Sequence, residues 1–234
     1  MVGDIQMEEV VAIAEETQQN MRERTGVSGP TGCADEESSD APLQYRSASG
    51  AVAQKSVVRK MSLPRPLYAM GFKEEYPTSD GKLILQRQIE SDILIDLLFG
   101  RSGDNYWKLY RPGLIDNTFT AGYYSLGDAA FVRLSSECAD PAELEKALQR
   151  LLHQDVASTI TAAAVERLRR KSLGEYVVSY EDFEGIASGL AEAEHWKIPF
   201  DAIPELIQEV SVESLKRRYA EIFRGEQMCS AVVS

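Results

Sequence analysis

Apolar residues recur with a helical period between Leu83 and Leu98. Four of them follow one another at intervals of four residues, which places them on one stripe of an α-helix: Leu85, Ile89, Ile93 and Leu97. Leu94 and Leu98 widen this stripe, so we expect a core helix that packs on a sheet. Gly100 follows the helix and is predicted to end it in the left-handed conformation.

Shorter apolar runs and alternating patterns predict strands in the rest of the chain. Leu67–Phe72 is typical of a buried strand, and 117–124 alternates large and small residues before a Gly127-Asp128 turn. Together with the following run, 129–135, this segment predicts a hairpin. An edge strand within 52–61 and a last strand over 227–233 complete the expected sheet.

Further helices are predicted on both sides of the hairpin. Asp140-Pro141-Ala142-Glu143 combines an N-cap, a proline at the first helical position and a glutamate three residues after the cap. Ser102 or Asp104 is expected to cap a short helix, and Ser211 a later one. The expected helices cover residues 7–21, 83–98, 106–110, 140–152, 159–176, 182–193, 200–208 and 211–223.

The order of strand, helix, hairpin, several helices and strand indicates an α+β fold. We predict a two-layer α/β sandwich with a mostly antiparallel sheet and helices on one face. Residues 1–24 contribute one isolated helix. The segment from Thr25 to Gly50 is rich in Gly, Ser and Pro, which predicts a flexible linker over 25–44 before a compact domain over 45–234; a disordered tail is the alternative.

Composition narrows the classes of partner. The 234 residues carry a net charge of −12, which argues against a broad surface for nucleic acid or anionic membranes. Three dispersed cysteines without a Cys-x-x-Cys pair are typical of reduced thiols. Without a visible signal peptide, or an apolar run near the ~20 residues of a membrane helix, we expect a cytoplasmic protein.

The sequence offers little catalytic chemistry. Its two histidines, His153 and His195, are far apart, and neither lies in a zinc-binding motif with a second histidine and a glutamate. No serine or cysteine occurs in a nucleophile motif. The basic run 167–171 is expected to be a solvated helix face, with contact to a peptide carboxylate as the alternative.

Four segments, in this order and spacing, resemble the C-terminal, non-catalytic half of bacterial M16 (insulinase-like, pitrilysin) zinc peptidases. They are Pro66–Lys73, Leu97–Phe119, Glu166–Glu175 and Ile207–Val233. The nearest subgroup is the paired-gene proteins associated with elongation factor P modification. The resemblance implies the LuxS/MPP-like metallohydrolase fold, and it identifies the first helix as the remnant of a preceding M16 domain.

In this family the non-catalytic half closes over the zinc-bearing half, binds the substrate peptide and lends an arginine and a tyrosine that polarise the scissile carbonyl. Here Tyr110 stands at the arginine position and Asp116 at the tyrosine position, while Arg111 is one residue away. A donor aimed at the developing oxyanion lowers the barrier, but an ionised aspartate cannot donate. Tyr110, Arg111, Tyr123 and Tyr124 are therefore the substrate-binding residues that we expect.

Two hypotheses follow from the resemblance. In the first, the chain is the non-catalytic half of an M16-type metallopeptidase, without a cofactor of its own, partnered by a zinc-bearing half or a paired M16 subunit and by a peptide substrate. In the second, suggested by Tyr110 and Asp116, the chain is an inactive M16 homologue that acts as a scaffold or assembly subunit. Under both hypotheses we expect inactivity of the isolated chain and an apolar face that a partner covers.

Overall fold

The computed structural model describes residues 6–25, 52–75, 80–126, 129–153 and 158–234. Its strands are β1 (Ser56–Arg59), β2 (Leu67–Glu75), β3 (Thr120–Leu126), β4 (Ala129–Glu137) and β5 (Met228–Val233). Its helices are α1 (Met7–Thr25), α2 (Gly81–Phe99), α3 (Asp104–Tyr110), α4 (Pro141–His153), α5 (Ala162–Ser179), α6 (Phe183–Trp196), α7 (Ile203–Glu209) and α8 (Val212–Ile222). Two single 3₁₀ turns, η2 (Phe200–Ala202) and η3 (Gly225–Gln227), precede α7 and β5.

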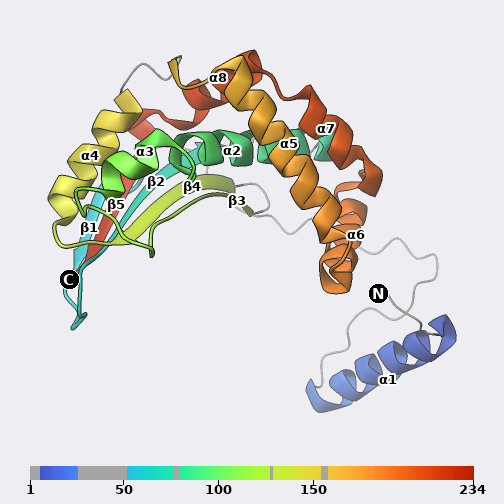
Figure 1. The fold of residues 1–234 in the computed structure, drawn as a ribbon. Helices are drawn as coiled ribbons and strands as arrows, with labels where there is room; N and C mark the ends of the chain where they lie inside the picture. Colours follow the sequence, from blue (N-terminus) through green and yellow to red (C-terminus); the bar gives the residue numbers. More distant parts are fainter. Residues whose placement is uncertain (1–5, 26–51, 76–79, 127–128, 154–157) are drawn as a thin grey trace.

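The five strands form one sheet in the order β1-β5-β2-β4-β3. The pairs β2–β5, β2–β4 and β3–β4 are antiparallel, whereas β1 and β5 run parallel. Figure 1 shows α2, α4 and α8 on one side of the sheet, with α5, α6 and α7 extending away from it. The α+β sandwich predicted from the sequence is confirmed, and the parallel β1–β5 pair makes the sheet mixed.

Strand β2 shows how the two faces of the sheet differ. Tyr68, Met70 and Phe72 are buried against the helices, as alternate residues of a strand share one face. Leu67, Ala69, Gly71 and Lys73 point to the opposite face, which the helices do not cover. The predicted buried strand is thus buried on one face only, and its other face is exposed or half-buried.

Helix α2 supplies the centre of the core. Its side chains at Ile93, Leu94, Leu97 and Leu98 are at most 5% exposed, and each contributes about 1.5–3 kcal/mol by leaving water. The helix begins at the N-cap Asp80, whose carboxylate accepts hydrogen bonds from two amides of the first turn.

The ends of α2 and α3 differ from the predictions. Gly100 is extended (φ −60°, ψ 146°) and not left-handed, and its amide donates to the Asp96 carbonyl at 2.8 Å. A Cβ at Gly100 would collide with both the carboxylate and the carbonyl of Asp96, so glycine is required here for space. The N-cap of α3 is Gly103, and neither Ser102 nor Asp104 caps this helix.

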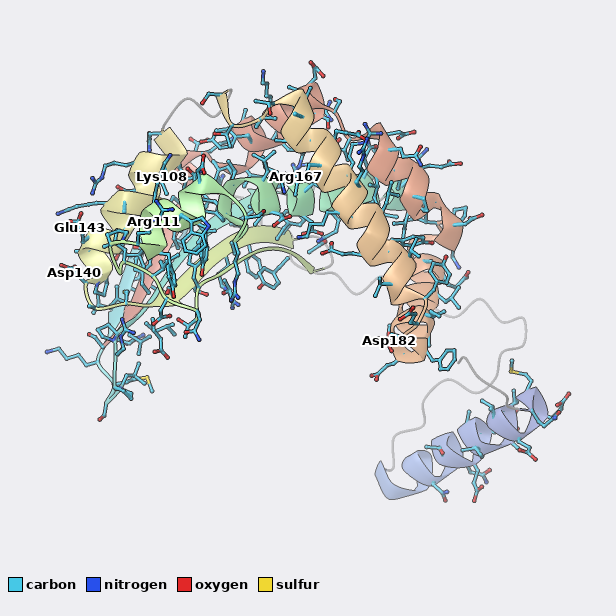
Figure 2. The ribbon with its side chains drawn as sticks, in the orientation of Figure 1. Lys108, Arg111, Asp140, Glu143, Arg167 and Asp182 are labelled. Atoms are coloured by element: carbon cyan, nitrogen blue, oxygen red, sulfur yellow. The ribbon has the colours of Figure 1, made fainter. Side chains whose placement is uncertain are left out.

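Two predicted helix caps are confirmed. Asp140 accepts from the amides of Ala142 and Glu143 at 3.0 and 3.1 Å at the start of α4 (Figure 2). Ser211 caps α8 in a reciprocal arrangement with Ser214. These caps fix two helices that both contact β2.

Helix α1 extends beyond its predicted end at Met21 and reaches Thr25. Val10 is half-buried, and the other side chains of α1 whose exposure is described are exposed. The predicted linker over 25–44 lies, after Thr25, outside the described residues. The division into a remnant helix, a linker and a domain over 45–234 therefore stays a prediction.

Candidate functional site

Tyr110 and Arg111 lie at the end of α3, close to the loop that leads into β3 (Figure 2). The Tyr110 ring stacks on Tyr106 with centroids 5.6 Å apart, and Trp107 contacts both rings edge-on. The Arg111 guanidinium lies 5.8 Å from the centre of the Trp107 ring. Tyr106 is buried, whereas Trp107 and Tyr110 are each 41% exposed. The two expected site residues therefore belong to one exposed aromatic and cationic cluster.

Asp116 is held by two neighbours. Its carboxylate accepts from the hydroxyl and the amide of Thr118, at 2.6 and 2.9 Å, and from Arg65 at 2.6 Å. The Thr118 hydroxyl, its amide and the Arg65 charge lower the pKa of Asp116. An ionised carboxylate accepts hydrogen bonds only, so Asp116 ties the start of β3 to the segment before β2 and offers no donor to a substrate.

Tyr123 and Tyr124 lie on opposite faces of β3. Tyr123 is 5% exposed, and its hydroxyl donates to the Glu74 carboxylate at 2.9 Å inside the core. Tyr124 lies on the face that the helices leave open. The structure thus separates these expected site residues, and a peptide on the open face meets Tyr124 alone.

Tyr124 belongs to an ordered group on the open face. Its ring stacks on Phe131 of β4, with centroids 5.2 Å apart and 18° between the planes. The Arg133 guanidinium lies 5.1 Å from the centre of the Tyr124 ring and donates to its hydroxyl at 3.3 Å. A Cβ at Gly122 would meet the Tyr124 ring at 3.2 Å, so the ring lies over this glycine. The two stacked rings and the Arg133 guanidinium thus form one aromatic and cationic group on the open face.

A buried ionic network lies beneath the opposite face. Arg218 of α8 is 1% exposed and forms two hydrogen bonds with Glu74 of β2, at 2.6 and 2.9 Å. Its remaining hydrogen bonds join it to Ser91 at 2.7 and 3.2 Å and to Glu221 at 2.7 Å. Arg87 is a second cation on Glu74. The network joins β2, β3, α2 and α8 at one point.

Charge pairing decides the ionisation of this network. Burial alone would raise the pKa of Glu74, but hydrogen bonds and charges from Arg218 and Arg87 outweigh burial and lower it. The same contacts raise the pKa of Arg218 despite its burial. Both groups stay charged, and Tyr123 is held on Glu74 rather than available to a substrate.

The sequence analysis missed this network, although two signals point to it. Glu74 continues the series of alternate residues of β2 that face the core, after Tyr68, Met70 and Phe72. Arg218 shares a helical face with Leu215 and Ile222, which are both buried. An acid on the apolar side of a strand and an arginine on the apolar side of a helix are expected to meet, because neither is buried without a partner.

A groove of about 570 Å³ lies between the outer side of β3 and the helices α2 and α5. Backbone and side chains of 120–122 form one wall, and α2 forms the other with Asp92, Ile95, Asp96 and Phe99. Arg101, Ser102, Tyr106, Phe119 and Lys171 complete the lining. The groove has the volume of a typical ligand site, although its aromatic residues, Phe99, Tyr106 and Phe119, are at most 7% exposed.

Charges in this groove are partly paired. Lys171, from the predicted basic run, binds Asp96 at 2.9 Å, while Arg101 donates to the Asn117 carbonyl at 3.3 Å. Asp92 lines the groove and keeps part of its surface in water. The protein packed around the groove raises its pKa to about 6, and a 2.9 Å hydrogen bond from Gln88 acts in the opposite direction.

The described residues do not form a zinc site. No group of three or more His, Cys, Asp or Glu side chains among them could hold a metal ion. His153 ends α4 exposed, with its Nδ1 2.7 Å from the Gln149 carbonyl, and the side chain of His195 lies outside the description. Likewise, no helix in the described ranges is long and apolar enough to cross a membrane.

No protein-family model matches the chain. Over 178 residues it is 23% identical to the uncharacterized zinc protease YmfH of Bacillus subtilis (strain 168). The aligned region is 76% of this chain and 41% of YmfH. The chain therefore spans about two-fifths of the length of this curated relative.

Solved structures show the same fold. An M16-like peptidase from Alicyclobacillus acidocaldarius matches with a TM-score of 0.77 at 21% identity, over 99% of this chain and 52% of that one. A peptidase M16 inactive domain from Pseudomonas fluorescens matches with a TM-score of 0.64 at 12% identity, over 99% and 52%. In sequence and fold the chain resembles M16-like peptidases, as its motifs predict. Its nearness to the paired-gene subgroup stays a prediction.

Proposed function

We propose that this chain is the non-catalytic C-terminal half of an M16-type zinc metallopeptidase. It contributes peptide binding and closes over a zinc-bearing half, or a paired M16 subunit, that carries the metal. The observation that carries this proposal is the likeness of its fold to an M16 inactive domain, together with the lack of a zinc donor set among the residues of this chain that the structure describes. The proposed location is the cytoplasm.

An exposed apolar surface supports the need for a partner. We call it the α5–α6 apex: Val177, Val178, Tyr180, Phe183 and Leu190, each at least 44% exposed. Clusters of large apolar side chains in water commonly mark surfaces that another protein covers. The apex spans the end of α5 and α6 as far as Leu190, and Asp182 between them caps α6 (Figure 2).

One observation favours the scaffold alternative. Asp116 stands where active family members are expected to carry a helper tyrosine, and it is fixed as an acceptor by Arg65 and Thr118. A chain that has given up this donor can retain the shape of an M16 half without assisting chemistry. The alternative predicts binding to a partner without any gain in its peptidase activity.

The proposal is tested by metal content and by association. The purified chain is expected to bind far less than one equivalent of zinc, and a tightly bound equivalent would count heavily against the assignment. Mixed with a His-x-x-Glu-His-bearing M16 half from the same genome, it is expected to form a one-to-one complex in light scattering after size exclusion. Two components that elute separately at micromolar concentration contradict it.

A further inference from the structure

We infer that the free chain binds a second copy of itself head to tail, through two different surfaces. The first surface is the α5–α6 apex. The second is the α3 cluster, by which we mean Trp107, Lys108, Tyr110 and Arg111. The partner is another molecule of the same chain, and the inference does not depend on the proposed function.

The composition of the α3 cluster is the first argument. All four of its side chains are exposed. Tryptophan, tyrosine and arginine are the residues most often found at the energetic centres of protein interfaces. The rings of Trp107 and Tyr110 contact each other edge-on, and Tyr110 also stacks on the buried Tyr106. Because these contacts already restrict the rings, a partner that covers them loses little affinity to their ordering.

The charge of the α3 cluster is the second argument. Among the described residues, no carboxylate forms an ion pair with Lys108 or Arg111. Lys108 donates to the Asn105 side chain at 3.2 Å, and Arg111 lies over the Trp107 ring. Two cations thus stand beside two exposed rings, in a chain whose net charge is −12. A surface that is both apolar and acidic is the partner that this combination favours.

The α5–α6 apex has this composition. Its exposed apolar side chains, such as Val177 and Phe183, are accompanied by the exposed acids Glu181, Asp182 and Glu184. The Asp182 carboxylate accepts from the Glu184 amide at 3.1 Å. No lysine or arginine in the described part of the chain forms an ion pair with any of the three acids. The apex therefore offers the apolar contact and the negative charge that the α3 cluster lacks.

Charge also decides which surfaces pair. Contact between two apexes brings acids against acids, and contact between two α3 clusters brings cations against cations. Contact between an apex and an α3 cluster brings opposite charges together and covers apolar groups on both sides. Because like charges across an interface are unfavourable, the unlike pair is the one that we expect.

The positions of the two surfaces require a second molecule. Figure 2 shows Lys108 and Arg111 beside α4, over the sheet, whereas Asp182 lies at the far end of α5 and α6. The two surfaces of one chain are therefore too far apart to contact each other. A contact between unlike surfaces leaves one free surface of each kind at the ends of the dimer, so further copies can add.

The test measures the mass of the intact chain and its variants by sedimentation over a range of concentrations. Phe183→Asp alters the apex, and Arg111→Glu alters the α3 cluster. We expect each variant alone to associate about tenfold or more weakly than the wild type, because each lacks one of the two surfaces. Arg224→Glu reverses an exposed cation outside both surfaces, and this matched control is expected to associate like the wild type.

An equimolar mixture of Phe183→Asp and Arg111→Glu is the decisive sample. The intact apex of the Arg111→Glu chain can bind the intact α3 cluster of the Phe183→Asp chain. We therefore expect a heterodimer that does not grow, whereas the wild type continues to larger species as its concentration rises. Sodium chloride at about 0.5 M is expected to weaken both associations, because it screens exposed charges. Thermal unfolding of each variant confirms that it folds.

Three results overturn the inference. Association of Arg111→Glu alone at the strength of the wild type indicates pairing between two apexes. A mixture of folded variants without a heterodimer excludes pairing of the apex with the α3 cluster, and a wild type that stays monomeric excludes self-association altogether. None of these results bears on zinc content or on association with a zinc-bearing half, so the proposed function is judged separately.

Discussion

The contact between Arg218 and Glu74 ties α8 to the sheet through a fully paired charge in the core. Removing Arg218 leaves the buried Glu74 carboxylate with Arg87 and the Tyr123 hydroxyl as its partners and takes away its two-bond contact, which costs more than the loss of an exposed pair. The contact also decides the fate of Tyr123, because its hydroxyl is bound to the same carboxylate. The Arg218–Glu74 pair therefore holds Tyr123 in a structural role, whereas Tyr124, the next residue of β3, stays at the surface.

Replacing Arg218 by methionine tests this role. We expect Arg218→Met to lower the free energy of unfolding by about 3–5 kcal/mol, because the Glu74 carboxylate stays buried and loses two hydrogen bonds. Urea unfolding measures the change. The control is Arg150→Met, which removes an exposed pair with Glu143 and is expected to cost about 0–1 kcal/mol. Equal costs in the two variants contradict the account.

The pH dependence of stability follows from the same carboxylate. The pKa of Glu74 is lower in the folded chain than its ordinary value of 4.5. Its contribution is therefore complete above about pH 4.5 and is lost as the pH falls through the lower folded-state pKa. We expect Glu74→Gln to make the loss of stability below pH 4.5 shallower than in the wild type, as measured by urea midpoints. An unchanged acid slope contradicts this expectation.

Sequence reasoning at this scale succeeded with the caps Asp140 and Ser211, was wrong about the cap of α3, and did not foresee which tyrosine of β3 is tied to a buried carboxylate. Asp140 and Ser211 act through their own backbone neighbours, so their spacing was sufficient. The direction of Tyr123 or Tyr124 depends on the register of β3 and on Glu74, which is 49 residues away. The alternation over 117–124 groups Tyr123 with Phe119 on one face, which the structure buries, but the bond from Tyr123 to Glu74 cannot be seen in that pattern.

At the scale of elements, Gly100 and Gly174 show that one residue type has two roles. Gly100 follows α2 and has no room for a Cβ beside Asp96, whereas a Cβ at Gly174, within α5, meets nothing within 4 Å. The first is required by close packing. The second weakens a helix by its conformational freedom.

These two glycines give a prediction of opposite sign. Gly100→Ala is expected to destabilise the fold by about 1–3 kcal/mol through a clash with Asp96. Gly174→Ala is expected to stabilise it by about 0.4–1 kcal/mol, because alanine restricts the unfolded chain and suits a helix. Thermal or urea unfolding of the two single variants measures both. If both variants change the free energy of unfolding in the same direction, the packing described for Gly100 at the C-terminal end of α2 is contradicted.

The order and type of the helices and strands were largely predictable. Long periodic segments such as α2 and the hairpin of β3 and β4 carry their own signal. The parallel pairing of β1 with β5 was not predictable, because β1 is four residues long and its partner lies at the far end of the chain. The groove beside β3 was hidden for a related reason, since its lining comes from residues as far apart in the sequence as Asp92 and Lys171.

At the scale of the whole molecule, the α5–α6 apex combines an apolar surface with a negative rim. Val177 and Phe183 are 66% and 63% exposed, and Glu181, Asp182 and Glu184 lie beside them. Burial of this surface against a partner removes apolar area from water, while the acids favour a partner with basic residues around its contact.

The apex predicts the behaviour of the isolated chain. We expect it to self-associate and to bind an apolar dye such as ANS, and Phe183→Asp to reduce both. Leu83→Asp is the matched control, because Leu83 is an exposed leucine of α2 outside the apex. It is expected to leave self-association and dye binding unchanged. A monomeric wild-type chain that does not bind the dye contradicts the idea of an open apolar face.

The central claim is that this chain completes a zinc peptidase rather than acting alone. Its most direct test is cleavage of a quenched fluorescent peptide library by a folded, zinc-loaded His-x-x-Glu-His half, with and without this chain, and with a chelator control. The account predicts chelator-sensitive cleavage in the mixture and almost none from either component. Cleavage that this chain does not stimulate, although the two components form a complex, contradicts the account and favours a scaffold.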